Sequence, residues 1–451
     1  MHEPARDMNT VPYARWPFYS PEDLPAEEAS RWWEECYVPG PLERSGSEPF
    51  WRILIGGPGS GKTVALLALA RREAAHALLI SYPPERWPGA PGEWVPGGNH
   101  LAQIMSSAAL ALRDLFFQRP DRIFTLSDLQ KEFLRWLMEK YLGSRAFRRW
   151  MEGLPAEYNE ALSRIPYQDL FPTTTQPLDV QGQIDELVNL ARRLGYSWVR
   201  ILTDFNEIRA RKHVGALRQL IGAYDLMLHP GFRMAMTLPR GLWSREELAR
   251  IARGRIEVTP LSWTREQVWE IALRHLRTAR GDPSLRLEDW IAPKLQQALE
   301  AWLLEEYGGY APAGWVGLAE TVLHLTTRLE RRLPRPLRPS DFREVIRSLC
   351  ARHLPLRMDP EARGVWRGPR FIPMADQPLN FLKALWERRG GPVDASDERV
   401  RALLGSRGAT KANLHTLAAR IRRQIEPFPD QPVYLINRRG EGGYFLEHIL
   451  E

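Results

Sequence analysis

The stretch Gly56-Gly57-Pro58-Gly59-Ser60-Gly61-Lys62-Thr63 decides the fold of the first half of this chain. A mainly apolar run at residues 51–55 precedes it, and a second run at residues 64–70 follows it. This order predicts a strand, a glycine-rich loop and a helix. Glycines let the backbone curl so that successive N–H groups point at one anion, and the helix presents its positive N-terminus to the same anion. The stretch therefore predicts a phosphate-binding loop.

The spacing G-x-x-x-x-G-K-T within this stretch is the P-loop, or Walker A, pattern. In this pattern Lys62 reaches the β- and γ-phosphates of a nucleotide, and the Thr63 hydroxyl binds Mg²⁺, so we expect ATP and Mg²⁺ as cofactors. A glycine-rich turn that binds nothing is disfavoured because a strand and a helix flank the loop. The expected nucleotide-binding residues are Gly56, Gly57, Pro58, Gly59, Ser60, Gly61, Lys62 and Thr63.

Length and composition limit the classes of protein. The 451 residues suffice for roughly two to four domains. No apolar run reaches the roughly 18–20 residues of a membrane span, and the N-terminus lacks the apolar core of a signal peptide. Two distant cysteines, Cys36 and Cys350, predict neither a disulfide framework nor a zinc site, so we expect a cytoplasmic protein. The net charge of +7 permits DNA as a partner. Arginine far outnumbers lysine, and a GC-rich genome explains this excess as well as a function does.

A second apolar strand pattern, residues 198–204, ends at Asp204. Downstream of a P-loop this is the Walker B pattern, in which the aspartate holds the Mg²⁺ shell through water at the ligand-binding edge of the sheet. An acidic residue that merely caps a loop is the alternative. Phe205 occupies the position of the usual catalytic glutamate, and Glu207 comes three residues after Asp204. Either Glu207 curls back to orient the attacking water, or hydrolysis is slow.

Three further strands complete the predicted sheet, at residues 77–82, 231–237 and 255–258. Thr237 ends one of them and is expected to touch the γ-phosphate or the attacking water. Arg240 either reports on the γ-phosphate in its own chain, acts as a finger toward a neighbouring chain, or is a solvated loop arginine. The expected catalytic residues are Lys62, Asp204, Glu207, Thr237 and Arg240.

This arrangement of motifs on five strands resembles AAA+ and STAND-type P-loop ATPases, including the origin-recognition branch. The phrase Glu257-Val258-Thr259-Pro260-Leu261-Ser262, which leads into a long helical region, adds to the resemblance. It covers residues 45–350 and implies a five-stranded parallel sheet ordered 5-1-4-3-2, with nucleotide between the sheet and a helical lid. Ala313 and Gly314 occupy the neighbourhood of the family's sensor-2 arginine, which is therefore not assigned.

After Asp376 the pattern predicts helices at residues 378–386, 397–405 and 411–425, then strands at 433–436 and 443–446 around a basic, glycine-rich tip. The third helix has one apolar face, formed by Leu414, Leu417, Ala418, Ile421 and Ile425. Three helices followed by a hairpin predict a winged helix-turn-helix domain.

The run Arg420-Ile421-Arg422-Arg423-Gln424-Ile425-Glu426-Pro427, followed by Val433-Tyr434-Leu435-Ile436 and Gly440-Glu441-Gly442-Gly443-Tyr444, resembles the OmpR-type response-regulator DNA-binding domain over about residues 368–450. In that family the third helix enters the major groove and the wing reaches the minor groove, where arginines contact guanine edges or phosphates. The family's N-terminal four-stranded sheet is hard to see in this sequence, and packing of the domain on protein is the alternative. The implied DNA-facing residues are Asn413, Thr416, Arg420, Arg423, Arg438 and Arg439.

The sequence thus predicts an α/β chain of four parts: an N-terminal segment (1–44), a P-loop ATPase core (45–260) with a helical insertion (100–195), a helical lid (261–355) and a winged helix domain (368–451). A helix at residues 25–37, with Trp32 and Trp33, either packs on the ATPase core near the nucleotide base or is a structural brace. The inserted helices offer a surface for protein partners, and a homo-oligomer is left open.

Three functions compete. The first is a slowly hydrolysing ATPase that switches binding to double-stranded DNA or assembly through the winged helix. The second is a STAND-like signalling or defence ATPase whose winged helix makes protein contacts or inhibits its own chain. The third, a metabolic kinase, is disfavoured because no small-substrate pocket motif accompanies the long lid.

Overall fold

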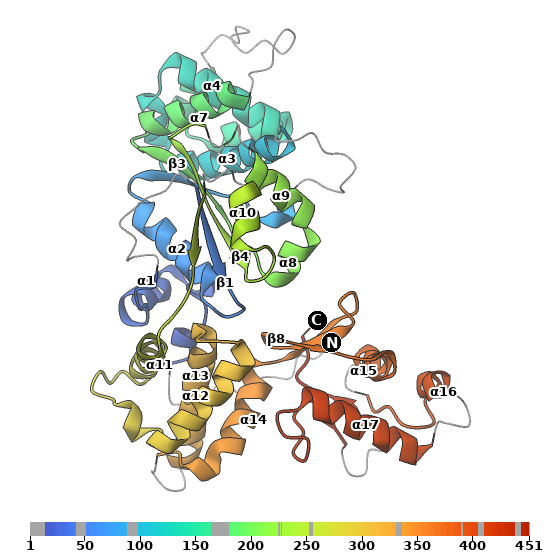
Figure 1. The fold of residues 1–451 in the computed structure, drawn as a ribbon. Helices are drawn as coiled ribbons and strands as arrows, with labels where there is room; N and C mark the ends of the chain where they lie inside the picture. Colours follow the sequence, from blue (N-terminus) through green and yellow to red (C-terminus); the bar gives the residue numbers. More distant parts are fainter. Residues whose placement is uncertain are drawn as a thin grey trace. The chain divides into compact units, whose positions relative to one another are not determined.

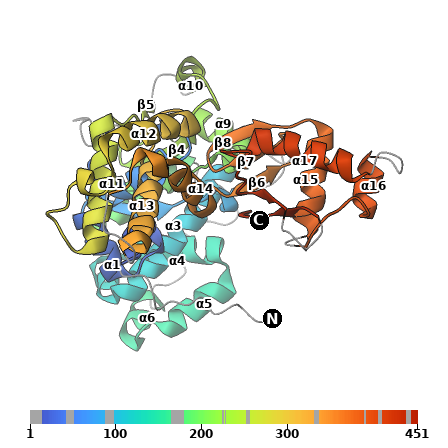
Figure 2. The same cartoon turned by 90° about the horizontal axis from the view of Figure 1, so that it is seen from below.

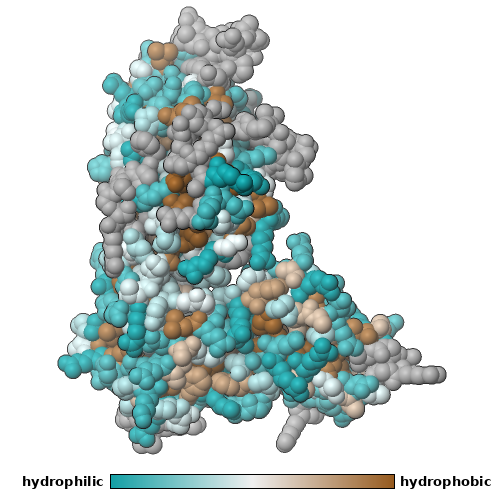
Figure 3. Space-filling view, in the orientation of Figure 1, coloured by the Kyte–Doolittle hydropathy of each residue, from teal (hydrophilic) through white to brown (hydrophobic). Residues whose placement is uncertain are grey.

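The computed structural model describes residues 14–41, 51–87, 98–163, 180–223, 226, 228–251, 256–330, 336–388, 391–404, 410–437 and 443–450. The chain forms two units: one is Pro39–Ser262, and the other joins Met1–Val38 to Trp263–Glu451. Within the described ranges, no helix is both long and apolar enough to cross a bilayer. In the view of Figure 3, hydrophilic residues cover most of the surface and apolar residues form small scattered areas.

A five-stranded, all-parallel sheet lies at the centre of Pro39–Ser262 (Figure 1). The strand order is β2-β3-β4-β1-β5, which read from the opposite edge is 5-1-4-3-2. The predicted parallel sheet, its order and the α/β class are therefore confirmed. The central strands are almost wholly buried, as expected when helices cover both faces. The strands are β1 (Trp51–Gly56), β2 (Ala77–Ser81), β3 (Trp198–Thr203), β4 (Phe232–Pro239) and β5 (Ile256–Pro260).

Helix α2 (Lys62–Glu73) begins directly after the glycine-rich loop and is fastened to the sheet at both ends. Leu66 and Leu69 pack against Ala235 of β4. At the far end, buried Glu73 accepts two hydrogen bonds from Arg200 of β3, from Nε to Oε2 and from Nη2 to Oε1, each 2.8 Å long. Because a buried charge without its partner is strongly destabilising, this pair fixes α2 to the strand that leads to Asp204.

The described residues between β2 and β3 are mainly helical, as the periodicity of residues 100–195 predicts (Figure 2). Their apolar faces join the core of the sheet in one cluster that runs from Trp51 to Leu248. Ser127 caps one of the helices through a capping box with Gln130. The elements are η4 (Pro84–Arg86), α3 (Gly98–Gln118), η5 (Pro120–Thr125), α4 (Asp128–Leu142), α5 (Ser144–Gly153), α6 (Ala156–Ser163) and α7 (Val180–Arg193); α8 (Glu207–Lys212), α9 (Val214–Gly222) and α10 (Arg245–Ile251) lie after β3.

Four helices follow Ser262 and form a bundle, in which Thr264 and Gln267 make the predicted capping box. The bundle consists of α11 (Arg265–Arg280), α12 (Pro293–Tyr307), α13 (Pro312–Glu330) and α14 (Phe342–His353), with η7 (Leu287–Asp289) and η8 (Pro339–Asp341) between them. Cys350 of α14 is buried and unbridged, as is Cys36.

The N-terminal segment belongs to the unit of this bundle and not to that of the sheet. It contains η1 (Trp16–Phe18), η2 (Pro21–Asp23) and α1 (Ala26–Glu35). The Trp32 ring meets His275 of α11 edge-on, with centroids 5.9 Å apart, and Arg274 donates from Nη1 to the Tyr37 carbonyl over 2.6 Å. Of the two expectations for this helix, the contacts of Trp32 and Tyr37 with α11 support the structural brace.

The last part of the chain begins with a three-stranded antiparallel sheet. Its strands have four residues each, which is too short for a clear alternating pattern in the sequence. Three helices and a short hairpin follow, and Val393 pairs with Tyr444 beside the hairpin. The elements are β6 (Leu356–Asp359), β7 (Gly364–Arg367), β8 (Arg370–Pro373), α15 (Asp376–Arg388), α16 (Glu398–Leu404), α17 (Lys411–Ile425), β9 (Leu435–Ile436) and β10 (Phe445–Leu446).

These C-terminal elements share one apolar core with the bundle, from Val268 to Leu446. A buried guanidinium reinforces the junction: Arg367 of β7, 4% exposed, donates from Nε to Glu306 Oε1 at the end of α12 over 2.8 Å. Its Nη1 donates to the Ile425 carbonyl, the last of α17, over 2.9 Å. One side chain thus connects the bundle, the small sheet and the third helix.

Candidate functional site

The glycine-rich loop adopts a backbone that only glycine tolerates well. Gly59 and Gly61 have φ of +70° and +81°, in the left-handed region. A Cβ on Gly56 would lie 2.1 Å from Ser60 Oγ, so a side chain there would displace the Ser60 side chain. The loop ends at Gly61, which caps α2 without a side chain, so that the first N–H groups of the helix face the loop. The geometry is that of an anion cradle.

Lys62 lies at the start of α2 and is buried. Its Nζ donates to the carbonyls of Gly56 and Gly57 over 3.0 and 2.9 Å. The loop backbone therefore holds an ammonium group at the N-terminal end of the helix, where positive charge from the helix dipole is also concentrated.

Three residues that the sequence predicted separately come together at the carboxyl edge of the sheet. Thr63 donates from Oγ1 to Asp204 Oδ2 over 2.7 Å, and Thr237 donates from Oγ1 to the other oxygen, Oδ1. The Phe205 amide donates to Thr237 Oγ1 over 2.7 Å, which fixes the direction of that hydroxyl. The cluster forms because β3, β4 and β1 are neighbours in the sheet and α2 follows β1.

The oxygens of Thr63 and Asp204 are suitable for Mg²⁺, which prefers hard oxygen ligands and keeps several waters. Their separation of 2.7 Å lets one hydrated ion serve both. In the part of the chain that the structure describes, no group of three or more His, Cys, Asp or Glu side chains could hold a metal. Thr63 and Asp204 supply two such oxygens, so the residues present fit a hydrated Mg²⁺.

Phe205 occupies the position after Asp204 where the resemblance places a catalytic glutamate. Its side chain is fully buried, and its ring meets Trp87 edge-on with centroids 4.8 Å apart. Trp87 in turn stacks on Tyr82 and contacts His100. The position is part of an aromatic core, where a carboxylate would be desolvated. Glu207 begins α8, but its side chain lies outside the described residues, so its role as a base stays a prediction.

The sequence does not predict the polar network behind this aromatic core. Burial lowers the pKa of His100 to about 4, so the ring is neutral near pH 7. Its Nε2 lies 2.9 Å from the Ala216 carbonyl, which can only accept, so Nε2 carries the proton and Nδ1 accepts from the Tyr82 hydroxyl over 2.8 Å. The signal was hidden because Trp87 stands in a Pro- and Gly-rich stretch that reads as a loop.

Arg240 lies directly after β4, beside the loop. Its amide donates to the Gly56 carbonyl over 3.0 Å, and its side chain is exposed. This position is compatible with each of the three interpretations of Arg240.

Comparison of the sequence with protein-family models gave no match, and comparison with curated proteins gave none. The interpretation of these residues therefore rests on the motifs and on the geometry described above.

A second candidate surface is the outer face of α17. Asn413, Thr416, Arg420 and Arg423 are all exposed, whereas Leu414, Leu417, Ala418, Ile421 and Ile425 are buried on the opposite face. The predicted division of this helix into two faces is confirmed. Arg438 and Arg439, predicted for the hairpin tip, lie outside the described residues.

Two further residues join α17 to the hairpin. Glu426 accepts the amides of Val433, Tyr434 and Leu435 over 2.7 to 2.9 Å. Burial raises the pKa of this carboxyl although the three donors act in the opposite direction. Arg422 donates from Nε to the Leu435 carbonyl over 2.8 Å, so this arginine fastens the helix and is not part of its outer face.

Proposed function

We propose that this chain is an ATP-binding, slowly hydrolysing switch that controls DNA binding or assembly through a C-terminal winged helix domain. The observation that carries the proposal is the contact of Thr63, Asp204 and Thr237 beside a glycine-rich loop, at the ligand edge of a sheet ordered 5-1-4-3-2. The resemblance to AAA+ and STAND-type ATPases supports the same assignment.

Each residue has a defined task in this proposal. The loop amides and Lys62 bind the phosphates, and Thr63 and Asp204 hold the hydrated Mg²⁺, which neutralises phosphate charge. Thr237 accepts from the Phe205 amide and donates to Asp204, so it keeps the carboxylate oriented. The aromatic core at Phe205 removes the usual base, which favours a switch over a fast motor.

The link to DNA is mechanical. The bundle and α17 share a core, and Arg367 connects α12 to the last turn of α17. We expect any nucleotide-driven movement of the bundle to carry α17 with it. The polar and basic positions on its outer face then meet or leave the DNA as one rigid surface.

Lys62→Ala tests the nucleotide site. We expect ATP affinity to fall at least about 100-fold, because the lysine supplies the charge nearest the phosphates. Isothermal titration with ATP and Mg²⁺ measures the effect, and DNA binding without nucleotide is the internal control. Normal ATP turnover by this variant would refute the assignment.

Duplex binding in the ATP, ADP and nucleotide-free states tests the output. We expect one nucleotide state to bind DNA more tightly, with an affinity that falls steeply as salt rises because phosphate contacts release counterions. No affinity in any state at moderate salt would remove DNA from the proposal and leave the nucleotide switch in place.

The second candidate, a STAND-like signalling or defence ATPase, is favoured by one feature. The helical insertion exposes Phe117, Phe124 and Leu129, which are large apolar side chains. Such residues suit a protein partner. Light scattering with a non-hydrolysable ATP analogue separates the two: a nucleotide-dependent closed oligomer without DNA supports this second function.

A further inference from the structure

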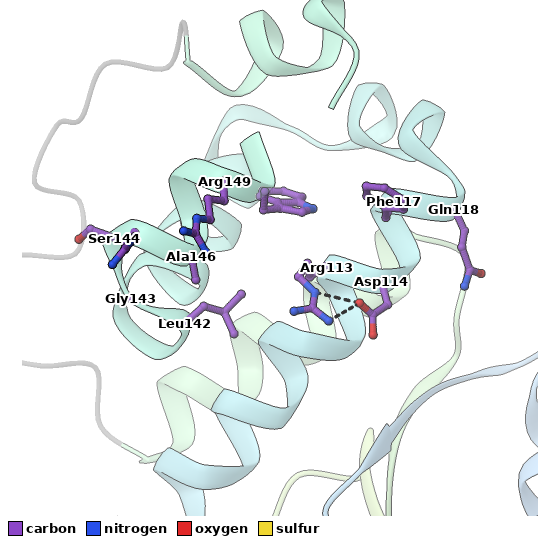
Figure 4. A pocket seen from close by; sticks show the side chains of 11 residues that line it. Arg113, Asp114, Phe117, Gln118, Leu142, Gly143, Ser144, Ala146 and Arg149 are labelled. Atoms are coloured by element: carbon purple, nitrogen blue, oxygen red, sulfur yellow. Dashed lines mark hydrogen bonds and ion pairs between the residues drawn. The ribbon is translucent and has the colours of Figure 1, made fainter. Parts of the chain in front are cut away.

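A groove of about 880 Å³ opens on the helical insertion (Figure 4), and none of the residues assigned to nucleotide lines it. Arg113 and Phe117 of α3 form one wall, and Leu142 and Arg149 lie opposite them (Figure 4). The first turn of α5, from Ser144, completes the lining. Such a mixed wall of cations and apolar groups is typical of a binding surface.

The positive charge in the groove is only partly compensated. Arg113 donates from Nε and Nη2 to Asp114 Oδ1 over 2.8 and 2.7 Å, so this pair is satisfied within the wall. Arg145 and Arg149 are exposed, and neither has a partner among the residues that the structure describes. They are four residues apart on α5, so they lie on the same face of the helix.

The N-terminal end of α5 adds to this positive field. The helix follows Gly143, and a glycine has no side chain that could cap it. The first turn of the helix contains no acidic residue. Gly143 and Ser144 both line the groove. The uncapped amides and the helix dipole therefore favour an anion at the same place as the two arginines.

The apolar part of the groove is also incompletely used. Phe117 is 66% exposed, although burial of such a ring is worth about 2 kcal/mol. Trp150 lines the groove with only 6% of its surface exposed, and its Nε1 has no hydrogen-bond partner within the described chain. Unpaired buried donors are rare in folded proteins, and this one belongs to a residue that lines the groove.

We propose that this groove binds an acidic segment of a partner protein. Carboxylates of the segment meet Arg145, Arg149 and the first turn of α5, and an apolar side chain covers Phe117. The proposal is independent of the nucleotide and DNA functions.

Charge balance favours a peptide over a nucleic acid. Residues 98–163 contain nine Lys and Arg and eight Asp and Glu, of which three arginines and one aspartate line the groove, so the net positive charge of this region lies in the groove. A nucleic-acid backbone needs a longer positive track, because it carries a phosphate at every nucleotide.

Peptide selection on the full chain tests the proposal. A phage library of random 16-residue peptides is panned on the wild type after depletion on the R145E/R149E variant. We expect the retained peptides to carry several Asp or Glu around a Leu, Phe or Trp. Random or basic sequences would overturn the proposal.

Fluorescence anisotropy with the best retained peptide gives the second readout. We expect R145E/R149E to weaken binding at least tenfold, Phe117→Ala to weaken it about threefold, and Arg148→Glu to change it less than twofold. Arg148 is the matched control because it is exposed on the same helix but does not line the groove. Thermal melts verify that each variant is folded, and selection is repeated with Arg149→Ala should the double variant unfold.

Two results would overturn the proposal at this stage. One is equal loss of affinity in the Arg148→Glu control, which would show a diffuse charge effect. The other is a 16-nucleotide single-stranded DNA that binds more tightly than the peptide and loses this affinity in R145E/R149E. That result would make the occupant of the groove a nucleic acid.

Discussion

The two units each use a buried arginine to fix a functional element, but they leave their functional residues in different states. Arg200 ties the C-terminal end of α2 to β3. Thr63, in the first turn of α2, and Asp204, directly after β3, are hydrogen-bonded to each other. Arg367 ties α12 to the end of α17, yet Arg420 and Arg423 on that helix project into solvent. The residues of the proposed nucleotide site are thus already hydrogen-bonded to one another, whereas the two arginines of α17 are exposed on a helix that is fixed at its end.

Loss of either arginine tests this shared device and gives the largest expected effect. Arg200→Met and Arg367→Met each remove the buried guanidinium that pairs with a buried glutamate, so we expect each to lower the free energy of unfolding of its unit by about 3–5 kcal/mol. Urea unfolding measures the loss. Arg370→Met is the control, because Arg370 is largely exposed and its pairs with Glu305 and Glu306 are worth little, about 0–1 kcal/mol.

Acid sensitivity compares the two units directly. Burial lowers the pKa of His100 in the first and of His275 in the second to about 4. A neutral buried histidine stabilises the folded state fully above the unfolded value near 6.5, and this contribution is lost as pH falls toward 4, because only the unfolded chain takes up the proton. We expect each unit to lose up to about 3 kcal/mol over this range. Urea titrations at pH 7 and 4.5 should show a smaller difference for His100→Gln; an unchanged difference would contradict the assignment.

The solvent-exposed face of α17 is tested by the R420A/R423A variant. We expect duplex affinity to fall about tenfold or more and the salt slope to decrease by about two, because each arginine is expected to neutralise one DNA phosphate. R343A/R347A removes the same charge from exposed positions on α14 and should change affinity much less. Equal effects of the two variants would mean that the whole charge of the chain, and not α17, binds DNA.

Glu207→Gln has the smallest expected effect on an already slow reaction. We expect turnover to fall about tenfold with ATP affinity within twofold, because a water-orienting base acts on the chemical step. Unchanged turnover would show that Glu207 is not the base that orients the attacking water.

Much of the sheet unit could be predicted from the sequence. The glycines of the loop and the short apolar strands are local signals, and the parallel order followed from the resemblance that they support. The aromatic core around Phe205 could not be predicted, because Trp87 and His100 reach it from outside the strands. For the same reason the sequence could not decide between the two positions open to α1, since its partners on α11 are about 240 residues away in sequence.

The sequence by itself determined the glycine-rich loop and its helix, the residues at the strand ends and the two faces of α17, because backbone freedom and periodicity act over a few residues. Only the tertiary structure decided which charges are paired and which remain open. Glu306 meets Arg367 across 61 residues of sequence, and Thr63 meets Asp204 across 141. Arg145 and Arg149 meet no partner among the described residues. Burial and pairing depend on groups that folding brings together, and no local pattern carries that information.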